Sequence, residues 1–364
     1  MAGLKMLLDA TKIGREAEKL EGDLRKRIVG QDAAIRQIVD LYQTFAAGMS
    51  TPGKPVGSFL FLGPTGSGKT RTVEALAESL LGDPRAVIKV DCAEFQHSHE
   101  IAKLLGSPPG YLGHRETHPM LSQDVLDQFH TEKMKLSLVL FDEIEKASDA
   151  LWNLLLGILD KAILTLGDNR RVDFSRAIIF LTSNLGAAEM NSLLRPNLGF
   201  AAGAGMADGK LNEKVSHVGV DAARRKFTPE FMNRIDRMVV FKPLGTDELY
   251  RILDIELRAL QERIGRAAGV HSLTFEVNDE ARDFLLREGT DERYGARHLK
   301  RAVERHLVQP ISNLMATGQA QSGDRLLVDF DAGRGRLIFL KESGETAPEV
   351  AVAAVSAAGQ RAAA

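Results

Sequence analysis

The 364-residue sequence has one cysteine, one tryptophan and almost no net charge. A single cysteine, Cys92, excludes an intrachain disulfide framework and a zinc site built from cysteines. The 47 Lys and Arg residues balance 49 Asp and Glu residues, which disfavours a protein whose whole surface binds nucleic acid. No uncharged apolar run approaches the roughly 18–20 residues of a membrane helix, and the N-terminal segment, interrupted by Lys5 and Asp9, is a poor signal peptide. We therefore expect a cytoplasmic protein without a membrane or nucleic-acid partner.

Short apolar runs alternate with amphipathic segments between Ile28 and about Pro243. Four runs have the length and continuity of strands buried on both faces of a parallel sheet: Ser58–Leu62, Ala86–Val90, Leu136–Phe141 and Ala177–Leu181. The segments Thr70–Leu81 and Ala147–Ile158 have helical periodicity. Strands and helices in alternation predict an α/β fold with a central parallel sheet and right-handed crossovers.

A smaller, mostly helical region follows the turn residues Pro243-Leu244-Gly245. Residues 246–318 are predicted to be mostly helical, and Arg325–Phe330 with Arg336–Lys341 predict a β-hairpin at its end. The Ala-rich residues that follow contain few large apolar side chains. The sequence thus predicts four segments: an N-terminal helix or linker (1–24), a large domain (25–243), a small C-terminal domain (244–342) and a disordered tail (343–364).

A complete GxxxxGK[ST] pattern is the strongest chemical signal in the sequence. It occupies eight consecutive residues: Gly63, Pro64, Thr65, Gly66, Ser67, Gly68, Lys69 and Thr70. Its glycines let backbone amides approach phosphates at the positive end of the following helix. Lys69 is predicted to reach the terminal phosphates, and the Thr70 hydroxyl to bind Mg²⁺. An apolar run before the pattern and a helical segment after it favour a nucleoside triphosphate site over a glycine-rich turn.

Carboxylates follow the apolar run that ends at Phe141. A nucleoside triphosphatase needs one acid for the Mg²⁺ shell and a second group that orients or deprotonates water, and Asp142 and Glu143 fit these two tasks. Acids after a strand are also typical of a helix N-terminus, an interpretation that the phosphate-binding pattern makes less favourable. Asn184 follows the next apolar run and is predicted to reach the attacking water, although an isolated Ser-Asn is usually a cap.

Several motifs in order along the chain carry a family resemblance. They are Arg27–Gln31, Ser58–Gly66, Pro108–Gly113, Asp142–Ala147, Thr182–Asn184, Pro229–Asp236 and Tyr294–Arg297. Together they resemble the Clp/AAA+ unfoldases, specifically the second ATPase module of ClpA, ClpB and ClpC, from about Leu20 to Lys341. The resemblance implies a P-loop AAA+ core, a smaller helical domain ending in a β-hairpin, and the hydrolysis of ATP with Mg²⁺.

The resemblance also implies roles for individual residues. Ile28 and Val29 resemble the apolar wall that holds adenine, Asn184 resembles sensor 1, and Arg297 resembles sensor 2. Arg234 resembles the arginine finger, which this family inserts into the neighbouring subunit's site to stabilise charge on the transferring phosphoryl group. A ring of identical subunits, usually a hexamer, is implied.

Without the family motif, the interpretation of Arg234 would be different. A surface ion pair with Glu230 or Asp236 would then be the more common arrangement. Both interpretations of Arg234 stay open at the level of the sequence.

Two further segments are implied to contact other polypeptides. Gly110, Tyr111, Leu112 and Gly113 resemble the pore loop that grips substrate, since an aromatic side chain offers apolar contact with little sequence discrimination. A turn with a packed tyrosine is the alternative. Leu198, Gly199 and Phe200 lie where protease-coupled relatives carry a loop that docks on ClpP, and packing of this tripeptide on its own domain is the alternative.

The sequence therefore supports a ring-forming ATPase that threads and unfolds polypeptides. If Leu198–Phe200 is a docking loop, the ATPase delivers them to a ClpP-like peptidase. Because the N-terminal domain and first ATPase module of full-length relatives are absent from these 364 residues, we expect substrate selection to involve other parts of the chain or an outside partner. The alternative is a nucleotide-gated scaffold that switches oligomers without threading. A nucleic-acid motor is disfavoured by the near-neutral charge.

Overall fold

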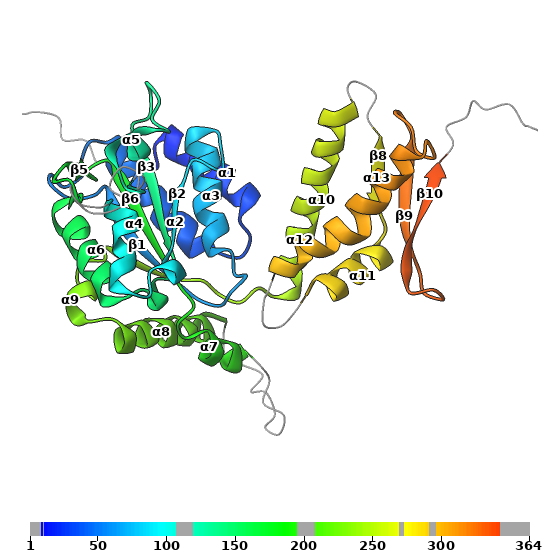
Figure 1. Cartoon of the computed structure of the whole chain (residues 1–364). Coiled ribbons are helices and arrows are strands. Elements are labelled where there is room, and N and C mark those ends of the chain that lie inside the picture. The colour runs from blue at the N-terminus through cyan, green and yellow to red at the C-terminus, as the bar shows by residue number, and fades with distance from the viewer. Residues whose placement is uncertain are drawn as a thin grey trace, which may run out of the picture. The chain divides into compact units, whose positions relative to one another are not determined.

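The computed structural model in Figure 1 describes residues 9, 11–106, 119–194, 208–268, 273–290 and 296–342. Its contacts divide the chain into two compact units. The first lies within Met1–Ile255 and Gly289–Lys300, and the second within Glu256–Glu288 and Arg301–Ala364. The domain boundaries at residues 24, 243 and 342 stay a prediction. Within the described ranges, no helix combines the length and apolarity needed to cross a membrane.

A sheet whose described pairings are all parallel forms the centre of the first unit. In spatial order its strands are β2 (Ile88–Asp91), β3 (Ser137–Asp142), β6 (Ala177–Ser183), β1 (Gly57–Leu62) and β7 (Arg237–Val240). Strands β1 and β6 are buried along their whole length, which is why they consist of continuous apolar residues. The predicted parallel sheet is confirmed, but the expectation that Ala86–Val90 is buried on both faces is wrong, because β2 lies at the edge and alternates buried and exposed residues. Strand β7 was not predicted, because it is short and mostly half-buried.

Helices cover both faces of this sheet (Figure 1). The α-helices that lie wholly in the first unit are α1 (Arg15–Arg27), α2 (Asp32–Ala46), α3 (Lys69–Leu81), α4 (Ala102–Leu105), α5 (Gln123–Asp127), α6 (Asp149–Lys161), α7 (Ala187–Leu194), α8 (Asp208–Lys226) and α9 (Pro229–Met232). The first parts of α10 (Thr246–Ala268) and α12 (Arg297–Val303) also belong to this unit. A small antiparallel hairpin, β4 (Ile163–Thr165) with β5 (Arg171–Asp173), follows α6. The observed layers are those of the predicted α/β fold.

The apolar core is divided by the sheet into two clusters. Alternate residues of β1 enter different clusters, with Leu60 and Leu62 in one and Phe59 and Phe61 in the other. This division follows from the pleat, since successive side chains of a strand point to opposite faces. Residues of α6 and α8 complete the first cluster, and residues of α1, α2 and α3 complete the second. The strand ends that carry the phosphate-binding pattern are therefore fixed from both sides.

The chain after residue 256 forms helices and a three-stranded sheet. Its helices are α11 (Asp279–Gly289), α12 (Arg297–Val303) and α13 (Gln309–Ala316), with a π-helical turn at Glu304–Val308. Strands β9 (Arg325–Asp331) and β10 (Arg336–Glu342) form the predicted antiparallel hairpin. Strand β8 (Thr274–Val277) adds to β9 in parallel. It lies inside the stretch predicted to be mostly helical and was missed because four residues give too short a pattern.

We expect Phe180→Ala to lower the free energy of unfolding by about 3–5 kcal/mol, because a fully buried aromatic side chain leaves a cavity. Phe180 stacks on Phe59, with ring centroids 5.3 Å apart and an interplanar angle of 8°. Urea unfolding followed by circular dichroism measures the change. Phe180→Leu should lower the free energy of unfolding by less. Equal stability of both variants and the wild type would contradict this assignment of the core.

Candidate nucleotide-binding site

The phosphate-binding pattern lies between the end of β1 and the N-terminus of α3. Gly63, Gly66 and Gly68 have φ values of 144°, 78° and 99°, in the region that favours glycine. A Cβ atom added at Gly63 would lie 2.4 Å from the backbone oxygen of Phe241, so a side chain at this position would clash with the segment that follows β7. The loop therefore has the curvature and the bare backbone that a phosphate cradle requires.

The Lys69 ammonium is directed into this loop. Only 7% of the residue is exposed, and Nζ donates to the backbone oxygens of Gly63 (2.7 Å) and Pro64 (2.9 Å) and to Asn184 Oδ1 (3.0 Å). Burial lowers the pKa of Lys69 to about 8, although nearby carboxylates, that of Asp142 foremost, act in the opposite direction. A buried cation that three oxygens already surround can exchange them for phosphate oxygens.

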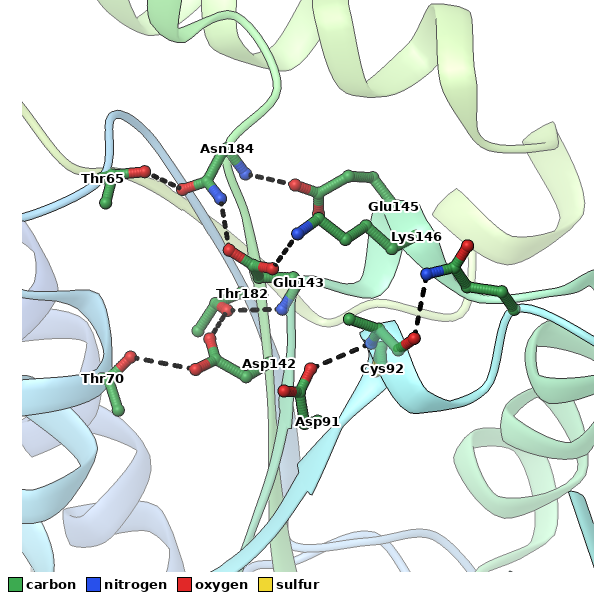
Figure 2. Close-up of polar contacts among 12 residues, drawn as sticks. Thr65, Thr70, Asp91, Cys92, Asp142, Glu143, Glu145, Lys146, Thr182 and Asn184 are labelled. Atoms are coloured by element: carbon green, nitrogen blue, oxygen red, sulfur yellow. Dashed lines mark hydrogen bonds and ion pairs between the residues drawn. The ribbon is translucent and has the colours of Figure 1, made fainter. Parts of the chain in front are cut away.

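Asp142, at the end of β3, faces two hydroxyl groups. Thr70 Oγ1, at the start of α3, donates to Asp142 Oδ2 over 3.5 Å, and Thr182 Oγ1 of β6 donates to Asp142 Oδ1 (Figure 2). The same Thr182 oxygen accepts a hydrogen bond from the Glu143 amide, 3.1 Å away. Thr182 therefore orients both acids, a role that was not predicted although the residue belongs to a motif recognised in the sequence.

The second acid, Glu143, has both carboxylate oxygens engaged. Asn184 Nδ2 donates to Oε1 over 3.1 Å, and the Lys146 ammonium lies 2.5 Å from Oε2 (Figure 2). The hydrogen bond from Lys146 is the main reason that the pKa of Glu143 is lowered from its ordinary value, with Asn184 contributing and partial burial opposing. Glu143 also has φ 57°, a left-handed conformation that is uncommon outside glycine and often occurs at functional sites.

Asn184 connects the two halves of the site. Its side-chain oxygen accepts from Lys69 (3.0 Å) and Thr65 (3.3 Å), its side-chain nitrogen donates to Glu143, and its backbone amide donates to Glu145 Oε1 (3.0 Å). Figure 2 shows the contacts of Asn184 with Thr65, Glu143 and Glu145. Glu145 and Lys146 were not given a role from the sequence, although the spacing of three between Glu143 and Lys146 is a signal for such a pair.

The oxygen ligands at this edge fit a Mg²⁺ ion. The Thr70 hydroxyl and the Asp142 carboxylate are hard oxygen donors beside each other, and magnesium in nucleotide sites is usually held by one or two such groups together with phosphates. Ser67 Oγ is buried and has no hydrogen-bond partner among the described residues, as expected of a hydroxyl group that binds a ligand. The residues present thus suit a Mg²⁺–nucleotide complex.

Ile28 and Val29 follow α1 and are both 6% exposed. Next to them, Gln31 Nε2 donates to the backbone oxygens of Ser67 (3.1 Å) and Lys242 (2.9 Å), which joins the phosphate-binding loop to the segment after β7. Gln31 was not predicted to have a structural role. The adenine wall at Ile28 and Val29 stays a prediction.

Of the remaining predicted site residues, Arg297 is near enough to Lys69 and Glu143 for its charge to contribute to lowering the pKa of both. Arg234 follows α9 and pairs with Glu230 (3.1 Å) and with Asp160 (3.7 Å), whereas Asp236 accepts hydrogen bonds from Ser58. The alternative considered for Arg234, an ion pair with Glu230 or Asp236, is thus met by Glu230. Arg297 is exposed at the first position of α12. The pore-loop residues 110–113 and the tripeptide 198–200 lie outside the described residues.

The phosphate-binding loop with its lysine and the neighbouring carboxylates are typical of a P-loop nucleotide-binding protein. A family model for the AAA domain (Cdc48 subfamily) matches residues 54–238, and a model for the C-terminal, D2-small domain, of ClpB protein matches residues 244–328. The chain therefore belongs to the AAA family, and within it to the Clp group, as the sequence motifs predict.

Relatives and a solved structure agree with this assignment. The chain is 38% identical over 329 residues to the chaperone protein ClpB of Meiothermus ruber, covering 90% of this chain and 35% of that protein. It is 37% identical over 343 residues to the ATP-dependent Clp protease ATP-binding subunit ClpC of Staphylococcus aureus (strain USA300), covering 92% and 40%. The closed-state cryo-EM reconstruction of Hsp104 with ATPγS and FITC casein superposes with a TM-score of 0.72 at 30% identity, covering 90% of this chain and 52% of that one. The chain thus spans between about a third and two fifths of the length of these curated relatives.

We expect the affinity for ADP without added Mg²⁺ to fall as the pH rises above 8, because the Lys69 ammonium binds phosphate only while it is protonated. Below pH 8 the free protein already carries this proton, so affinity should change little. Above it, each pH unit should cost up to about tenfold in affinity, since binding must then take up a proton. Titration with a fluorescent ADP analogue at pH 7, 8, 9 and 10 measures the dependence.

The control for this titration is Lys69→Arg, whose guanidinium keeps its charge throughout the range. Its weaker binding should stay constant between pH 8 and 10. Parallel declines in the wild type and in Lys69→Arg would contradict the assignment of the decline to Lys69.

Proposed function

We propose that the chain hydrolyses ATP within a hexameric ring of identical subunits and uses the cycle to pull polypeptide through a central pore and unfold it. The observation that carries this proposal is the position of Asn184, which binds both the phosphate-binding ammonium of Lys69 and the carboxylate of Glu143. A single side chain thereby links the proposed base to the ammonium proposed to bind the terminal phosphate, which supports the alignment that in-line attack by water requires.

In the proposed reaction, Lys69 binds the terminal phosphates and the apolar residues Ile28 and Val29 hold the adenine. Glu143 orients the attacking water and accepts its proton, and Asn184 holds Glu143 in place. Thr70 and Asp142 would hold Mg²⁺, which supplies positive charge that stabilises the phosphate oxygens when bound.

Two arginines are proposed to complete the site. Arg234 is supplied by the neighbouring subunit and stabilises charge on the transferring phosphoryl group. Arg297 responds to the phosphate state of the nucleotide.

The replacement Glu143→Gln should preserve ATP binding while kcat falls by about 10²–10⁴-fold, because the amide cannot accept the proton of water. The amide keeps the shape of the side chain and its contact with Asn184. Steady-state phosphate release gives kcat, and equilibrium binding of labelled ATP gives the dissociation constant. Turnover of the variant at the wild-type rate would refute the role of Glu143.

The polypeptide part of the proposal depends on the relatives and on Tyr111. The relative from Meiothermus ruber is named a chaperone, and the Hsp104 reconstruction is one with FITC casein. A ClpP-like peptidase contacting Leu198, Gly199 and Phe200 is the further partner that the name of the ClpC relative supports. A cytoplasmic location also belongs to the proposal.

Tyr111→Ala should leave ATP turnover within about twofold of the wild type but abolish unfolding of a tagged stable protein, because the pore would lose its large apolar contact. Loss of fluorescence of the tagged protein measures unfolding, and phosphate release measures turnover. Tyr111→Phe is the matched control and should retain unfolding. Unfolding that survives in Tyr111→Ala would favour the alternative function, a nucleotide-gated scaffold that switches oligomers without threading.

A further inference from the structure

Arg234 is held within its own subunit by two acidic residues. Its Nη1 lies 3.1 Å from Glu230 Oε1 and donates to the backbone oxygen of the same residue over 3.3 Å. Its Nε lies 3.7 Å from Asp160 Oδ1. The two contacts differ in origin: Glu230 is four residues away in the chain, on the short helix α9, whereas Asp160 is on α6.

The Nε atom of Arg234 faces Asp160 over 3.7 Å, a distance that allows an ion pair but not a hydrogen bond. This atom is buried and has no hydrogen-bond partner in the described part of the protein, and a buried N–H without compensation is costly. Asp160 is the acidic group paired with it, and its side chain is 43% exposed against 63% for Glu230. An ion pair of a mostly exposed carboxylate contributes little to fixing a side chain. Glu230 makes the shorter contact, but it lies on the same short segment as Arg234, whereas Asp160 belongs to a separate helix and can restrain the guanidinium from a different part of the core.

The backbone that carries Asp160 is firmly anchored. Leu155 and the other apolar residues of α6 are buried in the core. Trp152 of the same helix donates from Nε1 to the backbone oxygen of Ile144, 3.0 Å away, in the turn that follows Glu143. The Trp152 ring also packs on Phe227 and Phe231, with centroids 5.4 Å and 6.4 Å away. Helix α6 thus joins the turn after the proposed catalytic base to the residue that faces Arg234.

We propose that Asp160 is a positioning residue for Arg234, which it holds in the orientation that the neighbouring subunit's nucleotide requires. This inference rests on the proposed function, in which Arg234 acts on the adjoining site. An unrestrained arginine side chain loses rotamer entropy when it is fixed. A carboxylate on a rigid helix fixes it in advance, so less is lost when the transition state forms.

The first experiment compares variants in assembled rings. Asp160→Asn should lower kcat about tenfold while the KM for ATP stays within about twofold, because the site that binds ATP is intact and only the neighbour's arginine is misplaced. Asp160→Glu, which restores a carboxylate, should recover at least a third of the wild-type kcat. Glu230→Gln and Asp149→Asn, the latter in the first turn of α6, are matched controls and should stay within about twofold of the wild type.

The second experiment asks in which subunit the defect appears. Arg234→Ala subunits, which keep their own Glu143, are mixed with Glu143→Gln subunits, which donate an intact arginine. Turnover in these rings should be partly restored. Donors that carry both Asp160→Asn and Glu143→Gln should restore at least fivefold less. If Asp160 had only a structural role, the effect of Asp160→Asn would not appear in the neighbouring subunit's site.

The outcomes separate the inference from the function on which it rests. Equal rescue by donors with and without Asp160→Asn, or an unchanged kcat of Asp160→Asn, would overturn the positioning role of Asp160. Either result would leave the proposed role of Arg234 intact. Wild-type turnover of Arg234→Ala alone, or no rescue by Glu143→Gln donors, would instead overturn the proposed function. Mass photometry and thermal unfolding verify ring assembly and folding. If Asp160→Asn does not assemble, Asp160→Ser, which also lacks the carboxylate, takes its place in both comparisons.

Discussion

Burial of a positive charge is the constraint on which the nucleotide site depends. The Lys69 ammonium is almost inaccessible to water, and such a cation is tolerated only where oxygens surround it. Backbone oxygens of Gly63 and Pro64 and the side chain of Asn184 meet this need, which requires the loop to curl over the lysine. The carboxylates at the strand ends supply the opposing charge. The curvature of the loop, the bare backbone at Gly63 and the place of Asn184 are consequences of one electrostatic requirement.

The acidic side of the site is organised by different means. Asp142 is fixed by threonine hydroxyls, whereas Glu143 is fixed by one amide and one ammonium. Each oxygen of Glu143 has one such contact, and because a carboxylate has about four acceptor sites, this partly exposed group can still bind a water molecule. The Lys146 side chain is half exposed and lies on the same short turn, so the left-handed backbone of Glu143 places base and lysine together. The two neighbouring acids are thereby held in separate environments, as their separate proposed tasks require.

Much of the fold was predictable because the central strands are buried on both faces, so their sequences are continuous apolar runs. The context of the phosphate-binding loop followed from the run before Gly63 and the helical pattern after Thr70. Strands β7 and β8 were not predicted, because they are short and mostly not buried. The contact between Arg234 and Asp160 joins residues far apart in the chain and depends on how α6 packs, which no local pattern contains. For the same reason, the sequence did not distinguish Glu230 from Asp236 as a partner of Arg234, and Asp236 binds Ser58 instead.

The packing of Trp152 has a consequence for how this molecule can be observed. It is the only tryptophan in the chain, so the indole component of the ultraviolet emission comes from one place. The indole lies between the turn after Glu143 and the aromatic residues beside α9, and the Lys226 ammonium lies 5.4 Å from its ring centroid. Indole emission responds to nearby charge and to the loss of a hydrogen bond. The protein thus contains a natural spectroscopic reporter at the junction of its two proposed functional elements, with no background from another chromophore of that kind.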